Sequence, residues 1–264
     1  MKKVRIALAG IGAMGKTYAE MIYNGKIDRA KLTAVCARSA ASREWAKREL
    51  PGVRTAESLE ALFAEPDDFD AVVIALPHKM HCESALRAFS LGKHVLCEKP
   101  ISADFGEAFR MQKAAEKAGV KYGVIFQQRT FECYQKIKEL LGRKAVGRIV
   151  RASFTSSQYY RTPWYHSSGA WRSSWTGEGG GALMNQAQHP LDIFQWLLGM
   201  PQELYAKISF GKYNNFLVED EAHLLMNYES GLHSDFFLPQ EREYRRADLR
   251  LWEQRANYFW KTNG

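Results

Sequence analysis

Two short segments of the chain carry side chains that can move protons. Residues 95–100 read Val-Leu-Cys-Glu-Lys-Pro, so Lys99 follows a short apolar run, and Pro100 restricts the turn, with a cis peptide bond as one option. Residues 179–192 read Gly-Gly-Gly-Ala-Leu-Met-Asn-Gln-Ala-Gln-His-Pro-Leu-Asp and place His189 in the first turns of an expected helix. A lysine and a histidine near one substrate oxygen can supply the proton path of carbonyl–alcohol interconversion. The two segments therefore predict hydride-transfer chemistry, provided that a cofactor carries the hydride.

A glycine-rich turn near the start of the chain can hold such a cofactor. Residues 10–15 read Gly-Ile-Gly-Ala-Met-Gly, between an expected strand at 4–9 and an expected helix at 14–24. The first glycine permits the tight turn, the second lets the backbone approach a pyrophosphate, and the third lets helix and strand pack closely. The phosphates would lie at the helix N-terminus, where N–H groups and the helix dipole favour negative charge. The turn predicts a dinucleotide site that includes Gly10, Gly12, Ala13, Met14 and Gly15.

The residues after the second expected strand bear on the choice between NAD and NADP. A carboxylate about 20 residues beyond the glycines would bind the ribose 2′-hydroxyl of NAD. The chain has Ala37-Arg38-Ser39 at this place instead. Arg38 and Ser39, with Arg43 one helical turn further on, could bind the 2′-phosphate of NADP, although Arg38 could also be a solvated loop residue. The sequence favours NADP over NAD.

Composition limits the classes of function. The chain has 264 residues, enough for two domains, and its 37 basic and 29 acidic residues give a formal charge of +8. The basic residues are spread along the chain without a nucleic-acid motif, so we expect attraction for anionic phosphates but no nucleic-acid partner. Arg5 and the following glycines interrupt the apolar stretch that a signal peptide needs, and no apolar run approaches about 18 residues. We therefore expect a cytoplasmic protein without a membrane partner.

The four cysteines point to a reducing compartment. Cys36, Cys82, Cys97 and Cys133 form no Cys-x-x-Cys pair and no cluster with zinc-ligand spacing. Reduced cysteines fit a cytoplasmic protein. No metal site is expected.

Two different rhythms of hydrophobic residues divide the chain near residue 126. Up to there, expected strands at 4–9, 31–36, 71–76, 94–97 and 122–126 alternate with expected helices, which predicts an α/β domain whose parallel sheet has helices on both faces. Beyond Thr130, a helix at 132–141, a strand at 149–157, a helix through Leu198 and strands at 203–210, 218–228 and 231–238 predict an α+β domain with a mostly antiparallel sheet.

In combination, these motifs resemble the Gfo/Idh/MocA oxidoreductases, which include glucose-fructose oxidoreductase and inositol dehydrogenases. The resemblance covers residues 1 to about 238. It rests on the glycine turn, on Leu76-Pro77 with His81, on Glu98-Lys99-Pro100, and on the glycine-rich run that ends in His189 and Asp192. It implies an NAD(P)-binding Rossmann domain at 1–126 and a substrate-binding and oligomerisation domain with a large open sheet at 127–264. It also implies NAD(P)-dependent oxidation or reduction of a sugar, sugar derivative or cyclitol by a homodimer or homotetramer.

The resemblance assigns roles to single residues. Lys99 matches the lysine that binds and polarises the substrate oxygen, and His189 matches the histidine acid/base. Asn185 stands where many members carry an aspartate; an amide can hold a hydrogen bond but cannot relay a proton, so His189 is expected to act with Lys99 tuning it. Asp192 would either bind substrate or orient the site. Leu76, Pro77, His81, Glu98 and Gln127 match cofactor-side positions, and Arg129 lies close to the last of them.

An aromatic stretch precedes the glycine run. It contains Tyr159, Tyr160, Arg161, Trp164, Tyr165, Trp171, Arg172 and Trp175. Aromatic rings with neighbouring donors suit the C–H faces and hydroxyl edges of a sugar, but they also suit a domain or oligomer interface. For Trp171 and Arg172 we favour the substrate pocket.

The last residues and the overall function leave alternatives open. Residues 239–264 lack strand alternation, and the resemblance fades there. They are either a helical end at Arg242 to Phe259 or the product of a shifted reading frame, in which case the sheet would be incomplete. The alternative function is a non-catalytic NAD(P)-binding regulator of the same fold, which the presence of both Lys99 and His189 disfavours.

Overall fold

The computed structural model describes residues 2–157, 160–167, 169, 171–240, 247–253 and 257–261. The chain divides into two compact units, Met1–Ile125 and Phe126–Gly264. This division lies one residue before the boundary that the sequence suggests. Each unit is described by itself.

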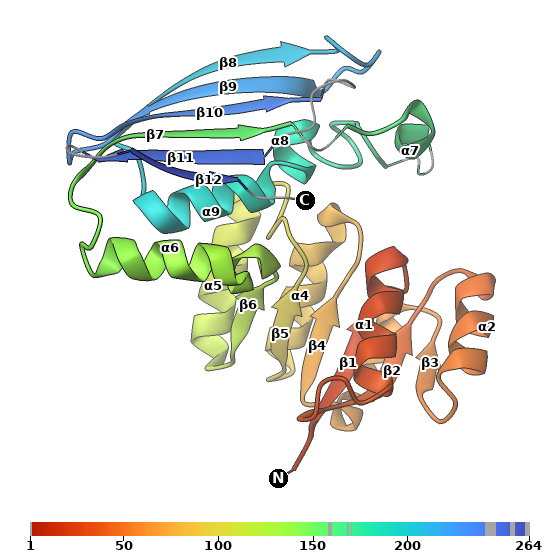
Figure 1. The fold of residues 1–264 in the computed structure, drawn as a ribbon. Coiled ribbons are helices and arrows are strands. Elements are labelled where there is room, and N and C mark those ends of the chain that lie inside the picture. Colours follow the sequence, from red (N-terminus) through yellow and green to blue (C-terminus); the bar gives the residue numbers. More distant parts are fainter. Residues whose placement is uncertain are drawn as a thin grey trace. The chain divides into compact units, whose positions relative to one another are not determined.

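The first unit is built on a parallel sheet of six strands (Figure 1). The strands are β1 (Val4–Ala9), β2 (Ala30–Cys36), β3 (Arg54–Ala56), β4 (Ala71–Ile74), β5 (His94–Cys97) and β6 (Tyr122–Val124), in the order β3-β2-β1-β4-β5-β6. This confirms the predicted Rossmann sheet. The strand β3 is not among the predicted strands, since three residues of the type Arg-Thr-Ala form no apolar run.

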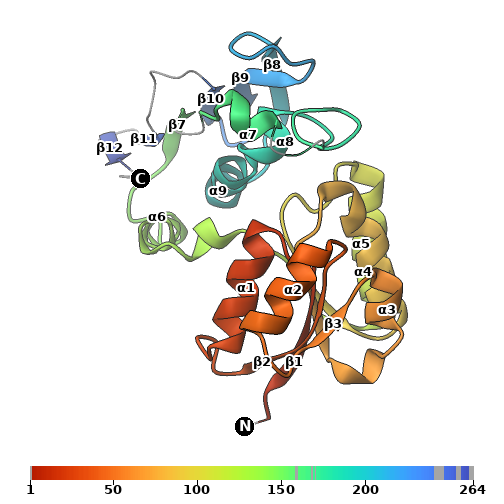
Figure 2. The same cartoon turned by 90° about the vertical axis from the view of Figure 1, so that its right-hand side faces the viewer.

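Helices cover both faces of this sheet, as predicted (Figure 2). One face carries α1 (Ala13–Tyr23) and α2 (Ala40–Glu49), and the other carries α3 (Leu59–Phe63), α4 (His81–Ser90) and α5 (Phe105–Ala118). Successive strand residues point to opposite faces. In β4, Val72 and Ile74 therefore belong to the core beneath α3, α4 and α5, whereas Val73 belongs to the core beneath α1 and α2. Two short 3₁₀ turns, η1 (Pro66–Asp68) and η2 (His78–Met80), flank β4.

The second unit packs helices on one face of a six-stranded mixed sheet. It runs η3 (Gln127–Thr130), α6 (Glu132–Gly142), β7 (Ile149–Ser156), α7 (Pro163–Ser167), α8 (Ala182–Asn185), α9 (Gln188–Leu198), β8 (Glu203–Phe210), β9 (Glu219–Asn227), β10 (His233–Pro239), β11 (Ala247–Glu253) and β12 (Asn257–Lys261). The strand order is β12-β11-β7-β10-β9-β8, and β7 with β10 is the one parallel pair among the described strands of this sheet. The predicted, mostly antiparallel sheet is confirmed.

The last described residues of the chain form the strands β11 and β12. The prediction of a helix from Arg242 to Phe259 is therefore wrong for the described residues in this range. β11 pairs antiparallel with β7 and with β12. The buried Leu249 and Leu251 alternate with the exposed Arg250, which is strand periodicity. Charged residues on the alternate positions hide this pattern in the sequence. Arg242 itself lies outside the described residues.

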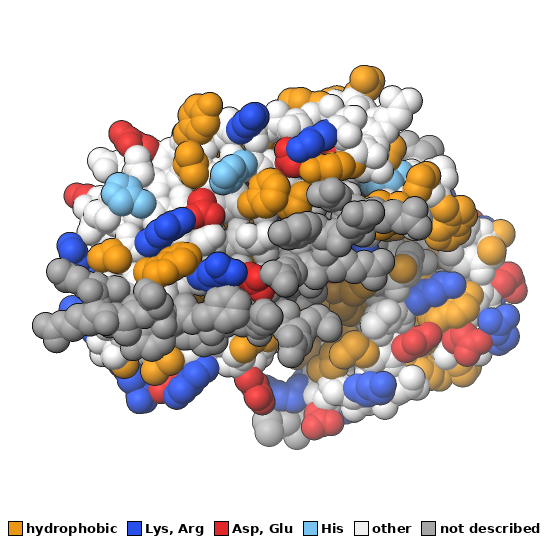
Figure 3. All heavy atoms as spheres, turned by 45° about the horizontal axis from the view of Figure 1, so that its top comes forward, with side chains coloured by type: hydrophobic (Ala, Val, Ile, Leu, Met, Phe, Trp, Pro, Cys, Tyr) orange, Lys and Arg blue, Asp and Glu red, His pale blue; other side chains and the backbone are white. Residues whose placement is uncertain are grey.

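One face of this second sheet is covered and the other is open. Phe154 of β7, Leu224 of β9 and Phe236 of β10 share a core with Ile193 and Phe194 of α9. On the opposite face, His223, Leu225 and Asn227 of β9 are exposed. Figure 3 shows the molecule with the top of Figure 1 brought forward. Hydrophobic, basic and histidine side chains are interspersed there over β8, β9 and β10. The open sheet face thus carries a mixed polar and apolar surface.

Candidate functional site

The glycine turn of the first unit has the geometry that a dinucleotide requires. Gly10 has a φ of 102°, and a Cβ there would lie 2.4 Å from the carbonyl oxygen of Ala75. A Cβ on Gly15 would lie 2.0 Å from the carbonyl oxygen of Gly10, so α1 could not pack against the turn. A Cβ on Gly12, by contrast, would meet no protein atom within 4 Å. The space beside Gly12, Ala13 and Met14 at the start of α1 is therefore open to a phosphate group, and the residues fit a dinucleotide cofactor.

The Glu98-Lys99-Pro100 motif lies at the carboxyl end of β5 and is held by its neighbours. The Glu98 N–H donates to Ile74 of β4 (2.9 Å). One Glu98 carboxylate oxygen accepts the hydroxyl of Tyr18 from α1, and the other accepts the Lys99 N–H (3.0 Å). Burial, followed by the hydrogen bond to Glu98, raises the pKa of Tyr18, so its hydroxyl keeps the proton that it donates. The Lys99–Pro100 peptide bond is cis.

His81 is fully buried and links two loops. Its Nδ1 lies 2.9 Å from the carbonyl oxygen of Pro100, and its Nε2 lies 2.9 Å from that of Leu76. Burial lowers the pKa of His81, while the two carbonyl oxygens oppose that change. The sequence prediction that His81 contacts the cofactor needs correction, because a ring without exposed surface reaches no ligand. Its place in this unit is to connect the loop of Leu76 and Pro77 with the loop of Lys99.

The loop after β2 exposes Arg38 and Ser39 at the start of α2. Ser39 caps this helix, since its hydroxyl accepts the Ser42 N–H (3.2 Å). The guanidinium of Arg43 donates to the carbonyl oxygens of Ala37 and Arg38, which closes the turn. The Arg43 guanidinium is thus engaged in hydrogen bonds to backbone carbonyl oxygens, whereas the Arg38 side chain is exposed to solvent.

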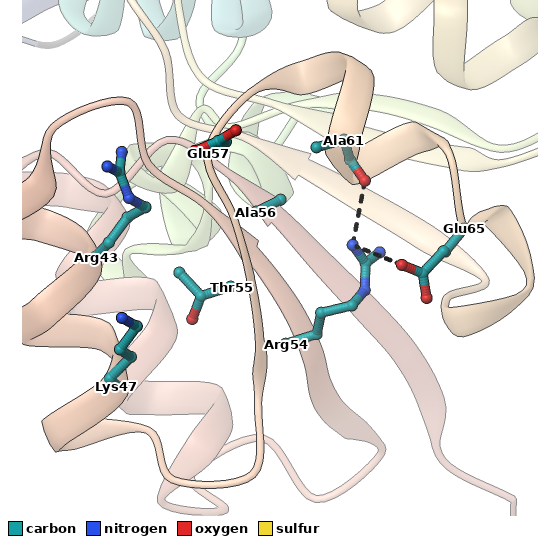
Figure 4. A pocket seen from close by; sticks show the side chains of 8 residues that line it. All are labelled: Arg43, Lys47, Arg54, Thr55, Ala56, Glu57, Ala61 and Glu65. Atoms are coloured by element: carbon teal, nitrogen blue, oxygen red, sulfur yellow. Dashed lines mark hydrogen bonds and ion pairs between the residues drawn. The ribbon is translucent and has the colours of Figure 1, made fainter.

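A hollow of roughly 380 Å³ lies beside the edge strand β3 (Figure 4). Its lining consists of Arg43, Lys47, Arg54, Thr55, Ala56, Glu57, Ala61 and Glu65. Arg54 turns to the carbonyl oxygen of Ala61 (3.2 Å) and the carboxylate of Glu65 (3.8 Å). Apart from Arg43, the hollow contains none of the predicted site residues, so it lies outside the candidate site.

In the second unit, η3 and α9 bring His189 together with Gln127. The side-chain amide nitrogen of Gln127 lies 3.3 Å from Nε2 of His189, and the Phe126 ring meets the imidazole edge-to-face at 6.1 Å. The Gln127 amide and the Phe126 ring thus fix the orientation of the His189 imidazole. The prediction placed Gln127 on the cofactor side; within this unit its partner is the histidine.

Asp192 is engaged by Arg129. The guanidinium of Arg129 donates to both carboxylate oxygens of Asp192, at 2.7 and 2.6 Å. Such a bidentate pair fixes both partners. It ties η3 to α9 beside the Gln127–His189 contact. Of the two roles left open for Asp192, the geometry supports the orienting one.

The glycine run before His189 serves packing rather than phosphate binding. A Cβ on Gly181 would lie 2.1 Å from the backbone carbonyl oxygen of Glu219 in β9. The Glu219 side chain, which is buried, accepts the N–H groups of Gly181 (2.9 Å) and Leu183 (3.0 Å) at the start of α8. Sequence reasoning missed Glu219, because its partners lie 36 and 38 residues away.

Asn185 is held by a second buried carboxylate. Its side-chain amide donates to Glu178, which is only 3% exposed, and the other Glu178 oxygen accepts the Ser173 N–H (2.7 Å). Glu178 was not singled out from the sequence. The only signal is a carboxylate within an otherwise glycine-rich stretch of 177–181.

The aromatic stretch places Arg172 between two rings. Its guanidinium carbon lies 4.2 Å from the Tyr165 ring centre and 4.7 Å from that of Trp171. It donates to the Tyr165 hydroxyl (2.5 Å), which lies 3.5 Å from the Asn185 amide nitrogen. Trp164 and Trp175 are instead exposed. Tyr159 lies outside the described residues.

Across the part of the chain that the structure describes, no helix is long and apolar enough to cross a membrane. The same residues contain no group of three His, Cys, Asp or Glu side chains placed to hold a metal ion.

Comparisons with known proteins identify both units. A family profile described as "Oxidoreductase family, NAD-binding Rossmann fold" matches residues 4–126, and one described as "GFO/IDH/MocA C-terminal domain" matches residues 134–254. The second match extends past residue 238, where the resemblance was expected to fade.

Relatives and a solved structure agree with the profiles. The chain is 32% identical over 190 residues to "1-carboxy-3-chloro-3,4-dihydroxycyclo hexa-1,5-diene dehydrogenase" of Comamonas testosteroni, covering 71% of this chain and 46% of the relative. It is 36% identical over 147 residues to inositol 2-dehydrogenase of Rhodococcus erythropolis, covering 55% and 42%. The WlbA dehydrogenase from Bordetella pertussis, solved with NADH and UDP-GlcNAcA, superimposes with a TM-score of 0.90 at 26% identity, over 97% of this chain and 77% of that one.

The chain spans about half the length of the curated relatives that it matches. The matched regions nevertheless cover both structural units. The chain belongs to the Gfo/Idh/MocA family of oxidoreductases.

Proposed function

We propose that the protein is an NAD(P)-dependent oxidoreductase that transfers hydride between nicotinamide and a hydroxyl or keto carbon of a sugar, sugar derivative or cyclitol. The observation that carries this proposal is the position of Lys99. It follows β5 at the carboxyl edge of the parallel sheet, the same edge at which the glycine turn follows β1. Parallel α/β sheets bind their ligands at this edge. Two relatives support this substrate class: the Rhodococcus protein is an inositol dehydrogenase, and the Comamonas protein is a dehydrogenase of a dihydroxy ring compound.

The residues divide the chemistry between them. The cofactor, held at Gly10, Gly12 and Gly15, supplies the hydride acceptor or donor. Lys99 binds the substrate oxygen and stabilises negative charge on it, with its backbone fixed by Glu98. His189, oriented by its contact with Gln127, exchanges the proton of that oxygen.

Three further residues of the second unit complete the proposed substrate site. The Asn185 amide holds a substrate hydroxyl, since it can donate and accept but cannot relay a proton. Asp192 and Arg129 keep α9 and η3 together, and so fix the position of His189. The second unit thus acts as the substrate-binding domain.

Turnover by a Lys99→Ala variant tests this function. With NAD or NADP and a panel of inositols, hexoses and their oxidised forms, we expect wild-type turnover and a loss of at least about a hundredfold in the variant. Lys121→Ala removes an equally charged side chain from the exposed loop before β6 and serves as the control. A Lys99→Ala protein that is folded and as active as the control refutes the mechanism.

For the cofactor, we propose NADP over NAD. The exposed Arg38 and Ser39 at the N-terminus of α2 present a positive charge, a hydroxyl and helix N–H groups where NAD-specific turns carry a carboxylate. Arg38→Ala should raise KM for NADP about tenfold and leave KM for NAD within about twofold, as expected for one charge-assisted contact. Equal KM values for both cofactors in the wild type would assign NAD(P) without preference.

We further propose a cytoplasmic homodimer or homotetramer that associates through the open face of the second sheet. The mixed surface of β8, β9 and β10, with Tyr205 68% exposed, supports the interface. The four free cysteines support the compartment. Sedimentation of the wild type and of Leu225→Arg, which puts a charge on this face, tests the association.

The second candidate function is an NAD(P)-binding regulator without catalysis. The formal charge of +8 favours it, since a basic surface attracts acidic partners. Cofactor binding without turnover on any polyol or ketose, together with capture of a protein partner, would select this function.

A further inference from the structure

Arg172 is a cation held in place by aromatic rings. Its guanidinium lies 4.2 Å from the ring centre of Tyr165 and 4.7 Å from that of Trp171. Rings attract a cation by their quadrupole but leave its net charge in place. The arrangement therefore orients Arg172 without neutralising it.

The charge of Arg172 has no carboxylate partner among the described residues. Its one side-chain hydrogen bond there goes to the neutral hydroxyl of Tyr165, at 2.5 Å. A second guanidinium, that of Arg161, lies 5.1 Å from the same tyrosine ring. Burial lowers the pKa of the neighbouring His166, as do the charges of Arg172 and Arg161, while a backbone hydrogen bond and the charge of Asp220 oppose the change. Two guanidinium groups thus lie at the Tyr165 ring.

This region is linked directly to the proposed substrate site. The hydroxyl of Tyr165 lies 3.5 Å from the amide nitrogen of Asn185, one helical turn before His189. An anionic group held by Arg172 would therefore sit a few ångströms from the residues proposed to bind the reacting part of the substrate. A guanidinium edge matches the paired oxygens of a carboxylate or phosphate.

We propose that the substrate carries an anionic oxygen group, a carboxylate or a phosphate, and that Arg172 binds it. The substrate class is then an acidic sugar or cyclitol, such as a uronate, a sugar phosphate or a nucleotide-linked sugar, rather than a neutral polyol. This inference rests on the proposed oxidoreductase function and narrows its substrate.

Matched substrate pairs test the inference. Glucose and glucuronate differ by a carboxylate, and glucose and glucose 6-phosphate differ by a phosphate. UDP-glucuronate carries both groups. We expect the wild type to show at least tenfold higher kcat/KM for an anionic member than for glucose, and the preferred member identifies the source of the charge. Arg172→Gln should lower that kcat/KM about 10- to 100-fold, mainly through KM, and the loss should be at least about fivefold larger than the loss of kcat/KM for glucose.

Two control variants separate charge from packing. Arg172→Lys keeps the charge and should retain part of the preference for the anionic substrate. Arg148→Gln removes an exposed arginine just before β7 of the same unit and should change neither substrate's kinetics. Melting temperatures of all variants show whether Arg172→Gln has disturbed the fold. Glucuronate or glucose 6-phosphate should raise the melting temperature of the cofactor-loaded wild type but not the melting temperature of folded Arg172→Gln.

The outcomes distinguish this inference from the function that it rests on. If turnover depends on Lys99 but kcat/KM for glucose equals or exceeds that for the anionic sugars, the proposal of an anionic substrate is refuted and the proposed oxidoreductase function stands. An equal loss on both members of a pair in Arg172→Gln assigns Arg172 to packing. If no sugar of the matched pairs is turned over and neither anionic sugar raises the melting temperature, both the anionic-substrate proposal and the proposed oxidoreductase function are refuted.

Discussion

Exchanging the buried carboxylate of Glu178 for an amide tests whether it sets the orientation of Asn185. In the native protein one carboxylate oxygen accepts the Asn185 amide N–H and the other accepts the Ser173 N–H. In Glu178→Gln, the new side-chain oxygen can still accept from Ser173, but the new NH₂ group then faces the NH₂ group of Asn185. Hydrogen bonds to charged groups contribute about 1.5–3 kcal/mol, so we expect a loss of about 2 kcal/mol of unfolding free energy.

A swap of the two side chains should restore the interaction. Asn185→Asp alone places a second carboxylate against the buried Glu178, and the repulsion should cost as much as Glu178→Gln or more. In the double variant Glu178→Gln/Asn185→Asp, the introduced amide can accept from Ser173 and donate to the introduced carboxylate, as a mirror of the native pair. The double variant should therefore be more stable than the sum of the single changes predicts by at least about 1 kcal/mol.

Equilibrium urea unfolding of the four proteins measures this coupling. The same proteins should show it in kcat/KM, because the Asn185 amide is proposed to hold the substrate. Additive losses in the double variant, within about 0.5 kcal/mol, would show that Glu178 and Asn185 act independently and would refute the reasoning.

Three further predictions concern the scaffold of the two units. Hydrogen bonds from Arg5 lower the pKa of Asp70 to about 2, so Asp70 stabilises the fold above its unfolded pKa near 4 and this stabilisation is lost as the pH falls through about 2. Asp70→Asn should cost about 1 kcal/mol of unfolding free energy at pH 7, after allowance for the partial exposure of Asp70, and the cost should vanish only below about pH 2. Gly181→Ala should destabilise the second unit by about 3 kcal/mol in thermal or urea unfolding, because its Cβ would collide with the backbone of Glu219. Gly142→Ala, whose Cβ would meet nothing at the end of α6, should leave stability unchanged or raise it by up to about 1 kcal/mol.

The parts of the fold that the sequence predicts are those with a local cause. The apolar run at 71–76 and the glycine turn after β1 are each determined by neighbouring residues, so β4 and the start of α1 follow from the sequence. The strand β3 is only three residues long, and it forms because β2 offers a free edge to pair with. β11 has the alternation of a strand, but its charged residues hide it until β7 is placed beside it. Short or polar strands depend on partners far away in the chain.

The candidate site divides in the same way. Lys99 and His189 can be named from the sequence, because few side chain types move protons near neutral pH and both follow recognisable turns. The residues that hold them, Tyr18, Arg129 and Glu219, are of common types, and their partners lie between 36 and 80 residues away in the chain. Nothing local distinguishes such a carboxylate or guanidinium from a surface charge.

Asn185 illustrates why the positioning residues matter for chemistry. An aspartate at this place, as in many members of the family, would bring a negative charge next to the histidine. Here the negative charge is instead on the buried Glu178, which accepts a hydrogen bond from the Asn185 amide. An amide does not take up or release a proton near neutral pH. In the proposed mechanism, asparagine in place of aspartate therefore keeps a polar group at this position but removes a second base, so that the proton exchange falls to His189.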